Sequence, residues 1–246
     1  MNSVVIAKFG GSVIGVDGIS IPIIIQRINS LSKDAKVVAV FSAPLTVVEG
    51  KRRSLTDVAL ELGKRAEEGK AFDLIILRKT YEKILELVSS EFQEKCRTVI
   101  DDCLDVVRIE LEKAMEKKEF ADEVRSKTLA YSGEILMSHM MEYILQSQGI
   151  KSKVVGLDNW PIITDSNIES TNFLASESNK KVEFLERLLD ENQVITIGGF
   201  IGRTADGVIT TYERGGSDRT AADLGILLHK KFDVKIDLEK DSSVVS

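Results

Sequence analysis

SVVIAKFGGS, at residues 3–12, contains the pattern that decides the fold. The run SVVIAKF is short, apolar and rich in β-branched residues, which is typical of a buried strand. The run stops at Gly10-Gly11, where the missing side chains let the backbone turn sharply. This stretch therefore predicts a buried strand that ends in a glycine turn.

The following residues complete a β-α-β unit. KVVAVFSA, at 36–43, has the same strand character and ends at Pro44. Between the two strands, IPIIIQRINSLSK at 21–33 carries apolar residues at helical spacing, with Ser20 as the expected N-cap and Pro22 in the first turn. A strand, a helix and a second strand in this order predict two parallel strands joined by a crossover helix.

The rest of the chain alternates between helical and strand patterns. Residues 55–148 are highly charged, lack proline and carry apolar residues at helical steps, so we expect several consecutive helices there. Strand and helix patterns then alternate: KVVGL at 153–157, VEFLERLLDE at 182–191, VITIGGF at 194–200, SDRTAADLGILLHKK at 217–231 and VKIDL at 234–238. This alternation predicts an α/β fold with an open, mostly parallel sheet that is covered by helices on both faces.

The composition is that of an ordinary globular protein. The 246 residues are 43% hydrophobic and carry a formal net charge of -6, with a pI near 5.2. Because an acidic surface repels polyanions, we expect neither nucleic acid nor an anionic membrane as a partner. The sequence shows no signal-peptide pattern after Met1 and no apolar stretch near the roughly 20 residues that span a bilayer. We therefore expect a cytoplasmic protein.

Several residues of chemically interesting types have a simpler structural interpretation. Cys96 and Cys103 lie about two helical turns apart, too far for a disulfide, and we interpret them as reduced structural thiols instead of a metal or redox pair. EGKRRS, at 49–54, is interpreted as an exposed loop instead of a binding patch. His139 and His229 have no partner at metal-ligand spacing, so we expect them to pack, as we do Met137, Met140 and Met141.

The segment Lys8-Phe9-Gly10-Gly11-Ser12 is the first candidate for chemistry. Paired glycines let backbone N–H groups approach a phosphate, and a lysine at the end of a strand can neutralise the charge of a transferring group. The alternative is a tight glycine turn beside a solvated lysine. This segment by itself leaves both interpretations open.

A second glycine-rich segment, Ile197 to Gly202, also follows a strand, at the sheet edge where open α/β folds bind ligands. The most informative stretch is TTYERGGSDRT at 210–220, directly before a helix. Arg214 offers a fork of donors for a carboxylate, Ser217 offers donors at a helix N-terminus, and Asp218 is a candidate cap for that helix. The stretch predicts an anion site. An N-capped helix alone needs neither the arginine nor two glycines.

A third element, Tyr131-Ser132-Gly133-Glu134, precedes the helical run ILMSHMMEYILQ. A carboxylate there could bind the ammonium group of a substrate. Taken alone, Glu134 is equally a helix-capping candidate.

Together these motifs resemble the catalytic domain of aspartate kinases, in the order KFGGS, SGE, GGFIG and TTYERGGSDRTA, over nearly the whole chain. The resemblance implies the amino-acid kinase fold, an α/β/α sandwich. It also implies that residues 1–246 form one kinase domain, with an acceptor-binding lobe at about 1–192 and the start of a nucleotide-binding lobe at about 193–246. Family relatives are commonly dimers, so a homodimer is expected.

The resemblance further implies a reaction, in which ATP with Mg2+ phosphorylates the side-chain carboxylate of L-aspartate as the entry to lysine, threonine and methionine synthesis. Lys8 and Asp218 are the implied catalytic residues, and Lys8 also stabilises the transferred phosphoryl group. No metal-ligating side chain is assigned. The implied acceptor site consists of Thr56, Glu134, Phe200, Arg214, Gly215, Gly216 and Ser217. The implied phosphate and ATP site consists of Lys8, Gly10, Gly11, Ser12, Ser42, Ala43, Glu239 and Lys240.

The chain departs from the family pattern in three places. A threonine usually follows the Ser-Ala strand end within a few residues, whereas here Thr56 is distant; Thr46 is its rival for the substrate-binding role. Tyr212-Glu213 replaces a leucine and a glycine, which should alter the lip of the site. Residues 239–246 differ from the family's nucleotide segment, whose continuation is expected beyond them.

Two alternatives to an aspartate kinase stay open at this point. One is another kinase of the same fold, such as a glutamate kinase, although an arginine together with Glu134 favours an amino-acid acceptor over UMP. The other is a non-catalytic amino-acid-binding or regulatory fragment, suggested by the divergent nucleotide segment.

Overall fold

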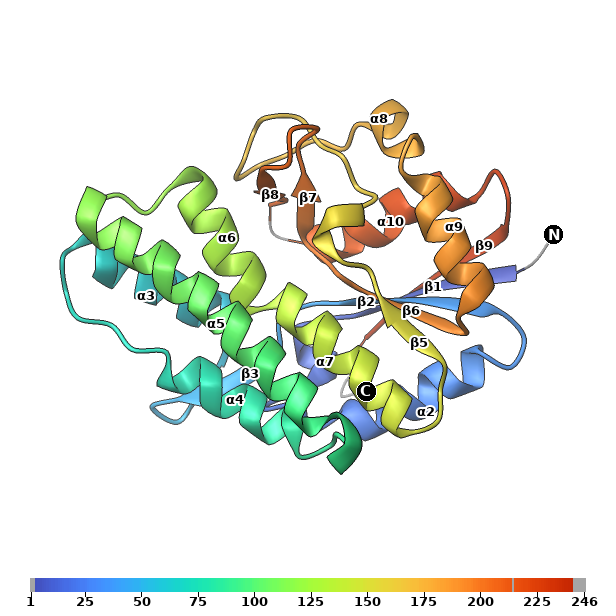
Figure 1. The fold of residues 1–246 in the computed structure, drawn as a ribbon, viewed down its shortest axis with the longest axis horizontal. Helices are drawn as coiled ribbons and strands as arrows, with labels where there is room; N and C mark the ends of the chain where they lie inside the picture. Colours follow the sequence, from blue (N-terminus) through green and yellow to red (C-terminus); the bar gives the residue numbers. More distant parts are fainter. Residues whose placement is uncertain (1–2, 214, 241–246) are drawn as a thin grey trace, which may run out of the picture.

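The central sheet brings together strands from the beginning, middle and end of the chain (Figure 1). The computed structural model describes residues 3–213 and 215–240. Five strands lie in the order β5-β6-β2-β1-β9, and every neighbouring pair is parallel. Their bounds are β1 Ser3–Phe9, β2 Lys36–Phe41, β5 Ser152–Val154, β6 Val194–Gly198 and β9 Asp233–Glu239. The predicted open parallel sheet is confirmed.

Helices cover both faces of this sheet because its inner strands have no polar face. Every residue of β2 after Lys36 is buried, as is every residue of β6. Figure 1 shows α2 (Ile21–Leu31) and α7 (Glu134–Ser147) on one face, and α9 (Val182–Glu191) and α10 (Gly216–Leu228) on the other. The α/β fold with two covered faces is therefore confirmed.

The predicted helical region forms a separate layer beside the sheet (Figure 1). Its helices are α3 (Leu55–Glu67), α4 (Ile75–Leu85), α5 (Ser90–Lys117) and α6 (Asp122–Ser132). The short elements that complete the described chain are α1 (Gly11–Ile14), β3 (Leu45–Val48), β4 (Lys51–Ser54), a 3-10 turn (Leu157–Asn159), α8 (Ala175–Asn179), β7 (Ile201–Arg203) and β8 (Ile209–Thr211). Strands β6 and β9 lie in the same sheet as β1 and β2, so the sheet crosses the expected boundary at residue 193. The division into two lobes stays a prediction.

The loop predicted at 49–54 is wrong, because these residues belong to a hairpin. Strands β3 and β4 pair antiparallel, with Val48 opposite Lys51. The two residues between them, Glu49 and Gly50, both have positive φ angles, of 49° and 75°. Such a turn matches the twist of two paired strands, and its usual sequence is Asn-Gly or Asp-Gly. Because the turn contains a glutamate and the strand Lys51–Ser54 is charged, the sequence pattern did not predict a hairpin.

The smaller structural interpretations largely hold. Cys96 and Cys103 are free thiols buried in α5, and burial raises the pKa of each to about 12. Met137, Met140 and Met141 lie in the core. Ser20 occupies the N-cap position of α2, but its side chain makes no capping hydrogen bond. Among the residues that the structure describes, no helix is both long enough and apolar enough to span a membrane.

We expect Ile6→Ala in β1 to lower the free energy of unfolding by about 2–5 kcal/mol, because it removes a large side chain that has no exposed surface and leaves a cavity. Ile226→Ala, on α10, is the matched control, since Ile226 is 47% exposed and should change stability by less than about 1 kcal/mol. Urea unfolding of both variants measures the difference. Equal effects would contradict the position of β1 in the core.

Candidate active site

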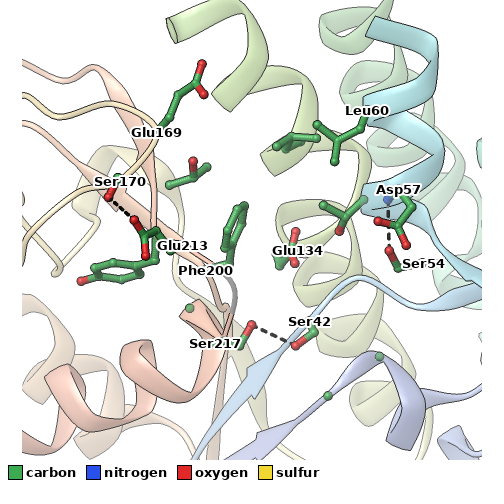
Figure 2. Close-up of a pocket in the computed structure, with 18 of the residues that line it drawn as sticks. Ser42, Ser54, Asp57, Leu60, Glu134, Glu169, Ser170, Phe200, Glu213 and Ser217 are labelled. Carbon is green, nitrogen blue, oxygen red and sulfur yellow. Dashed lines mark hydrogen bonds between the residues drawn. The ribbon is translucent and has the colours of Figure 1, made fainter. Parts of the chain in front are cut away.

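A cavity of about 1040 Å³ opens at the carboxyl edge of the sheet, between the sheet and the helical layer (Figure 2). Parallel strands all end at this edge, so the segments that follow β1, β2 and β6 meet there. The residues that line the cavity are Lys8, Gly10, Gly11, Ser12, Ser42, Ser54, Thr56, Asp57, Leu60, Arg125, Leu129, Glu134, Glu169, Ser170, Phe200, Thr211, Tyr212, Glu213, Gly215, Gly216 and Ser217. Most of the predicted site residues are therefore brought together.

Lys8 supplies a positive charge on the sheet side of the cavity. Its Nζ lies 2.7 Å from Oδ1 of Asp218, and the two side chains are 17% and 51% exposed. Asp218 does not cap α10 as expected, because Gly215 is the N-cap residue and Asp218 lies in the first turn. The carboxylate thus faces Lys8 and holds the ammonium group at the cavity wall.

The ends of β2 and α10 also meet across the cavity floor. Ser42 donates a hydrogen bond from its Oγ to Oγ of Ser217, at 2.9 Å (Figure 2). Ser42 follows β2, and Ser217 lies in the first turn of α10. The two hydroxyls and the Lys8 ammonium form a polar floor whose donors suit an anionic group.

Glu134 is the buried acid of the cavity, with 4% of its surface exposed. Its Oε1 accepts a hydrogen bond from the backbone N–H of Ala43 at 3.2 Å, whereas its Oε2 has no partner among the described residues. Burial raises the pKa of the Glu134 carboxyl to about 7, although the Ala43 N–H partly offsets this effect. Leaving a buried polar group unpaired costs about 1–3 kcal/mol, more when it is charged. The position is suited to a cationic ligand group.

The surrounding backbone fixes Glu134 in this position. A Cβ atom added to Gly133 would lie 2.8 Å from Cβ of Ala43, and one added to Gly198 would lie 3.0 Å from the Glu134 carbonyl carbon. Both glycines therefore permit a close approach that a larger residue would prevent. The buried hydroxyl of Tyr81 donates to the Gly133 carbonyl at 2.9 Å, which holds the break between α6 and α7.

Phe200 forms the wall between the acid and the far side of the cavity, and in the view of Figure 2 its ring lies between Glu134 and Glu213. Its φ angle is 69°, a left-handed conformation that costs a non-glycine residue about 1–3 kcal/mol. Two hydrogen bonds hold this conformation. The Phe200 N–H donates to Oγ1 of Thr220 at 3.0 Å, and the Phe200 carbonyl accepts from the N–H of Tyr212 at 2.9 Å.

The hairpin explains why Thr56 is so distant in sequence from Ser42-Ala43. Leu45 pairs with Ser54, and the N–H of Leu55 donates to the carbonyl of Pro44 at 3.0 Å, so the chain returns to where it left β2. Thr56 then lines the cavity in the first turn of α3.

Its rival, Thr46, does not line the cavity. The Thr46 side chain is buried, donates to Asp17 at 3.0 Å and accepts from Thr80 at 2.9 Å. A substrate-binding role for Thr46 is therefore not supported.

Four of the predicted residues do not line the cavity. Ala43 lies just behind it and contributes its backbone N–H to Glu134, and Asp218 acts through Lys8. Glu239 pairs with Nε of Arg27 at 2.5 Å, and Lys240 is exposed after the end of β9. The nucleotide-binding roles of Glu239 and Lys240 stay predictions. Arg214 lies outside the described residues.

Sequence reasoning missed one wall of the cavity. Glu169 and Ser170 come from the loop at 165–172, which has no motif of its own, and Arg125 comes from the middle of the helical region. Nη1 of Arg125 lies 2.5 Å from Oε2 of Glu169, and Ser170 donates to Glu213 at 2.8 Å. Only the tertiary fold brings these residues together.

Asp57 was also missed, although it adjoins Thr56 and could have been considered with it. Its backbone N–H donates to Oγ of Ser54, the N-cap residue of α3, at 3.0 Å (Figure 2). The carboxylate of Asp57 thus lies at the first turn of a helix and at the cavity wall.

An open α/β sheet with polar groups gathered at its carboxyl edge defines a small-molecule binding protein. The amino acid kinase family matches residues 3–231 of the chain. The chain therefore belongs to the amino acid kinase family, as the resemblance of its motifs implied.

Curated relatives are similar over part of the chain. The aspartokinase of Rickettsia felis is 34% identical over 109 residues, which cover 44% of this chain and 26% of the relative. A bifunctional aspartokinase/homoserine dehydrogenase 2 of Arabidopsis thaliana is 31% identical over 113 residues, covering 45% of this chain and 12% of the relative.

Solved structures are similar over nearly all of the chain. Aspartokinase III of E. coli, in complex with aspartate and ADP, has a TM-score of 0.70 at 21% identity, covering 96% of this chain and 49% of the other. The aspartate kinase of Clostridium acetobutylicum has a TM-score of 0.60 at 19% identity, covering 92% and 46%. The chain thus spans about half the length of these proteins, and the likeness supports the fold.

We expect the stability of the protein to fall as pH rises from about 4.5 to about 7, through the contribution of Glu134. Its folded pKa is above its unfolded pKa, so between these values the folded state binds more protons than the unfolded state. Above pH 7, the ionised Glu134 carboxylate should lower the free energy of unfolding by about 3 kcal/mol relative to its value at low pH.

Glu134→Gln removes this contribution, so the difference in unfolding free energy between the wild type and this variant should change with pH over that window. Urea unfolding at pH 5, 6, 7 and 8 measures it. A difference that does not depend on pH would contradict the raised pKa.

Proposed function

We propose that the chain is the catalytic domain of an aspartate kinase, which transfers the γ-phosphoryl group of ATP to the β-carboxylate of L-aspartate. The observation that carries the proposal is the buried Oε2 of Glu134, which no described residue pairs, in the same cavity as the Lys8–Asp218 pair. The ammonium group of an amino acid would be a hydrogen-bond donor and a positive charge for this Glu134 oxygen. The carboxylates of that amino acid are anionic, as is the phosphoryl group, and the polar floor offers donors to such groups.

In this proposal the described site residues divide into those that bind the acceptor and those that face the transferred phosphoryl group. Glu134 binds the substrate ammonium and thereby orients the acceptor, so that its carboxylate attacks the phosphorus in line. Lys8 neutralises charge that develops on the transferred group, and Asp218 fixes the position of Lys8. Thr56, Phe200, Gly215, Gly216 and Ser217 shape the acceptor pocket, while Gly10, Gly11, Ser12 and Ser42 border the phosphate. Ala43 contributes its backbone N–H to Glu134.

ATP and Mg2+ belong to the proposal as co-substrate and cofactor. The E. coli relative was solved with aspartate and ADP, which supports a nucleotide in this fold. Bound Mg2+ would offset the negative charge of the phosphate groups. The described residues contain no group of three or more His, Cys, Asp or Glu side chains arranged for a metal.

The wider setting is also part of the proposal. The product, 4-phospho-L-aspartate, is the first intermediate in the synthesis of lysine, threonine and methionine, which takes place in the cytoplasm. The family resemblance supports a homodimer and an acceptor lobe that precedes a nucleotide lobe. Light scattering of the purified protein tests the dimer.

We expect Lys8→Ala to reduce kcat by about 100-fold or more, because it removes a charge that stabilises the transition state. Aspartate affinity should change little, since the ammonium of the acceptor is bound by Glu134. A coupled ADP-release assay measures turnover, and isothermal titration measures affinity. Lys33→Ala is the matched control, because Lys33 is exposed and does not line the cavity.

The same assays separate the alternatives. Phosphorylation of glutamate in preference to aspartate would indicate a different kinase of this family. Aspartate binding with neither Mg-ATP binding nor turnover would indicate a non-catalytic amino-acid-binding fragment. Unchanged turnover in Lys8→Ala would contradict the assigned role of Lys8.

A further inference from the structure

Two buried side-chain oxygens lack a hydrogen-bond partner among the described residues, and both belong to residues that line the cavity. They are Oε2 of Glu134 and Oγ1 of Thr211. Buried polar groups are nearly always paired, because an unpaired group loses its hydration without compensation. Two exceptions in one cavity indicate that a ligand supplies both partners.

Thr211 makes hydrogen bonds through its backbone but, among the described residues, none through its hydroxyl. It ends β8 and has no exposed surface. Its N–H donates to the carbonyl of Ile168 at 2.7 Å, and its carbonyl accepts from the N–H of Thr171 at 3.2 Å. The loop at 165–172 therefore pairs both the N–H and the carbonyl of Thr211, and of its polar groups only the hydroxyl lacks a partner among the described residues.

The preceding residue, Thr210, provides a direct comparison. It is equally buried, but its Oγ1 lies 2.7 Å from Oγ1 of Thr164, so its hydroxyl is paired inside the protein. Burial in β8 thus does not by itself leave a hydroxyl unpaired. The two hydroxyls differ because Thr210 and Thr211 lie on opposite faces of β8, since alternate residues of a strand point in opposite directions.

The wall around Thr211 also contains a guanidinium, that of Arg125, in an ion pair with the carboxylate of Glu169. The loop is tied to α6 by Glu169, which accepts from the backbone N–H of Asp122 at 2.8 Å and pairs with Nη1 of Arg125. A guanidinium has five N–H donors, and among the described residues the Arg125 guanidinium donates a hydrogen bond to Glu169 alone, which leaves donors for a ligand. The other cation of the described lining, Lys8, is likewise in an ion pair, with Asp218.

We propose that Thr211 is a further ligand-binding residue of this cavity, whose hydroxyl donates to a carboxylate oxygen of the amino-acid acceptor, with Arg125 supplying N–H donors on the same wall. This inference rests on the proposed function and deepens it. Glu134 recognises the ammonium group and Thr211 a carboxylate, so the two unpaired oxygens together select an amino acid over a simple amine or a simple acid.

The test uses Thr211→Val, which keeps the shape of the side chain and removes the hydroxyl. Aspartate affinity, measured by isothermal titration, should fall about tenfold, because a hydrogen bond to a charged group is lost. The unfolding midpoint without ligand should not decrease, because no protein partner is lost. Thr210→Val is the matched control, and it should lower the unfolding midpoint while leaving aspartate affinity within about twofold.

Each other result overturns the inference. Unchanged aspartate affinity in Thr211→Val would mean that the hydroxyl does not contact the ligand. An unfolding midpoint reduced as much as in Thr210→Val would mean that the hydroxyl has a structural partner such as a buried water. If the wild type binds neither aspartate nor glutamate, the proposed function itself fails, which is distinct from a wild type that binds and a variant that binds equally well.

Discussion

The burial of the Glu134 carboxyl is the constraint on which the candidate site depends. One oxygen is held by the N–H of Ala43 directly after β2, and the other has no partner among the residues that the structure describes. The acid can be so close to the sheet only because Gly133 and Gly198 lack side chains. Burial in turn raises the pKa of the carboxyl to about 7, so the group is close to its titration midpoint at neutral pH. A cationic ligand would pair the second oxygen and offset the free-energy cost of burying the charged carboxylate.

The rest of the cavity is arranged around this acid. Lys8 and Asp218 form an ion pair at the same cavity, where β1 ends and α10 begins. Phe200 separates the acid from the outer wall and keeps a left-handed backbone that its neighbours stabilise. Local strain and an unpaired acid are both unfavourable for folding alone, and their occurrence in one cavity is typical of a site shaped for a ligand.

Much of the fold could be predicted from the sequence because its signals are local. Buried strands such as Val194–Gly198 are continuous apolar runs, and the glycine segments mark where strands end. Lys8, Glu134 and Ser217 each lie beside a glycine segment. The resemblance of these segments to a known family placed them in one site, and the cavity contains all three. The hairpin was missed because its turn is Glu49-Gly50 and its second strand is charged.

The outer wall could not be predicted for a different reason. Arg125 and Glu169 are separated by 44 positions and meet only when α6 packs beside the loop at 165–172. Thr211 has no local signal that its hydroxyl is unpaired, because its neighbour Thr210 is chemically identical and is paired. Such properties depend on tertiary contacts and on which side of a strand a residue faces.

The central claim is that Glu134 binds the ammonium group of an amino acid, and proton release on binding tests it most directly. Burial raises the pKa of the carboxyl to about 7, so ammonium binding near pH 7 should expel a fraction of a proton per aspartate bound. Isothermal titration of aspartate in buffers of different ionisation enthalpy measures this number. The account predicts proton release in the wild type that shrinks as pH rises to 8 and is lost in Glu134→Gln. Aspartate binding without proton release at pH 7, or equal release in both proteins, would contradict it.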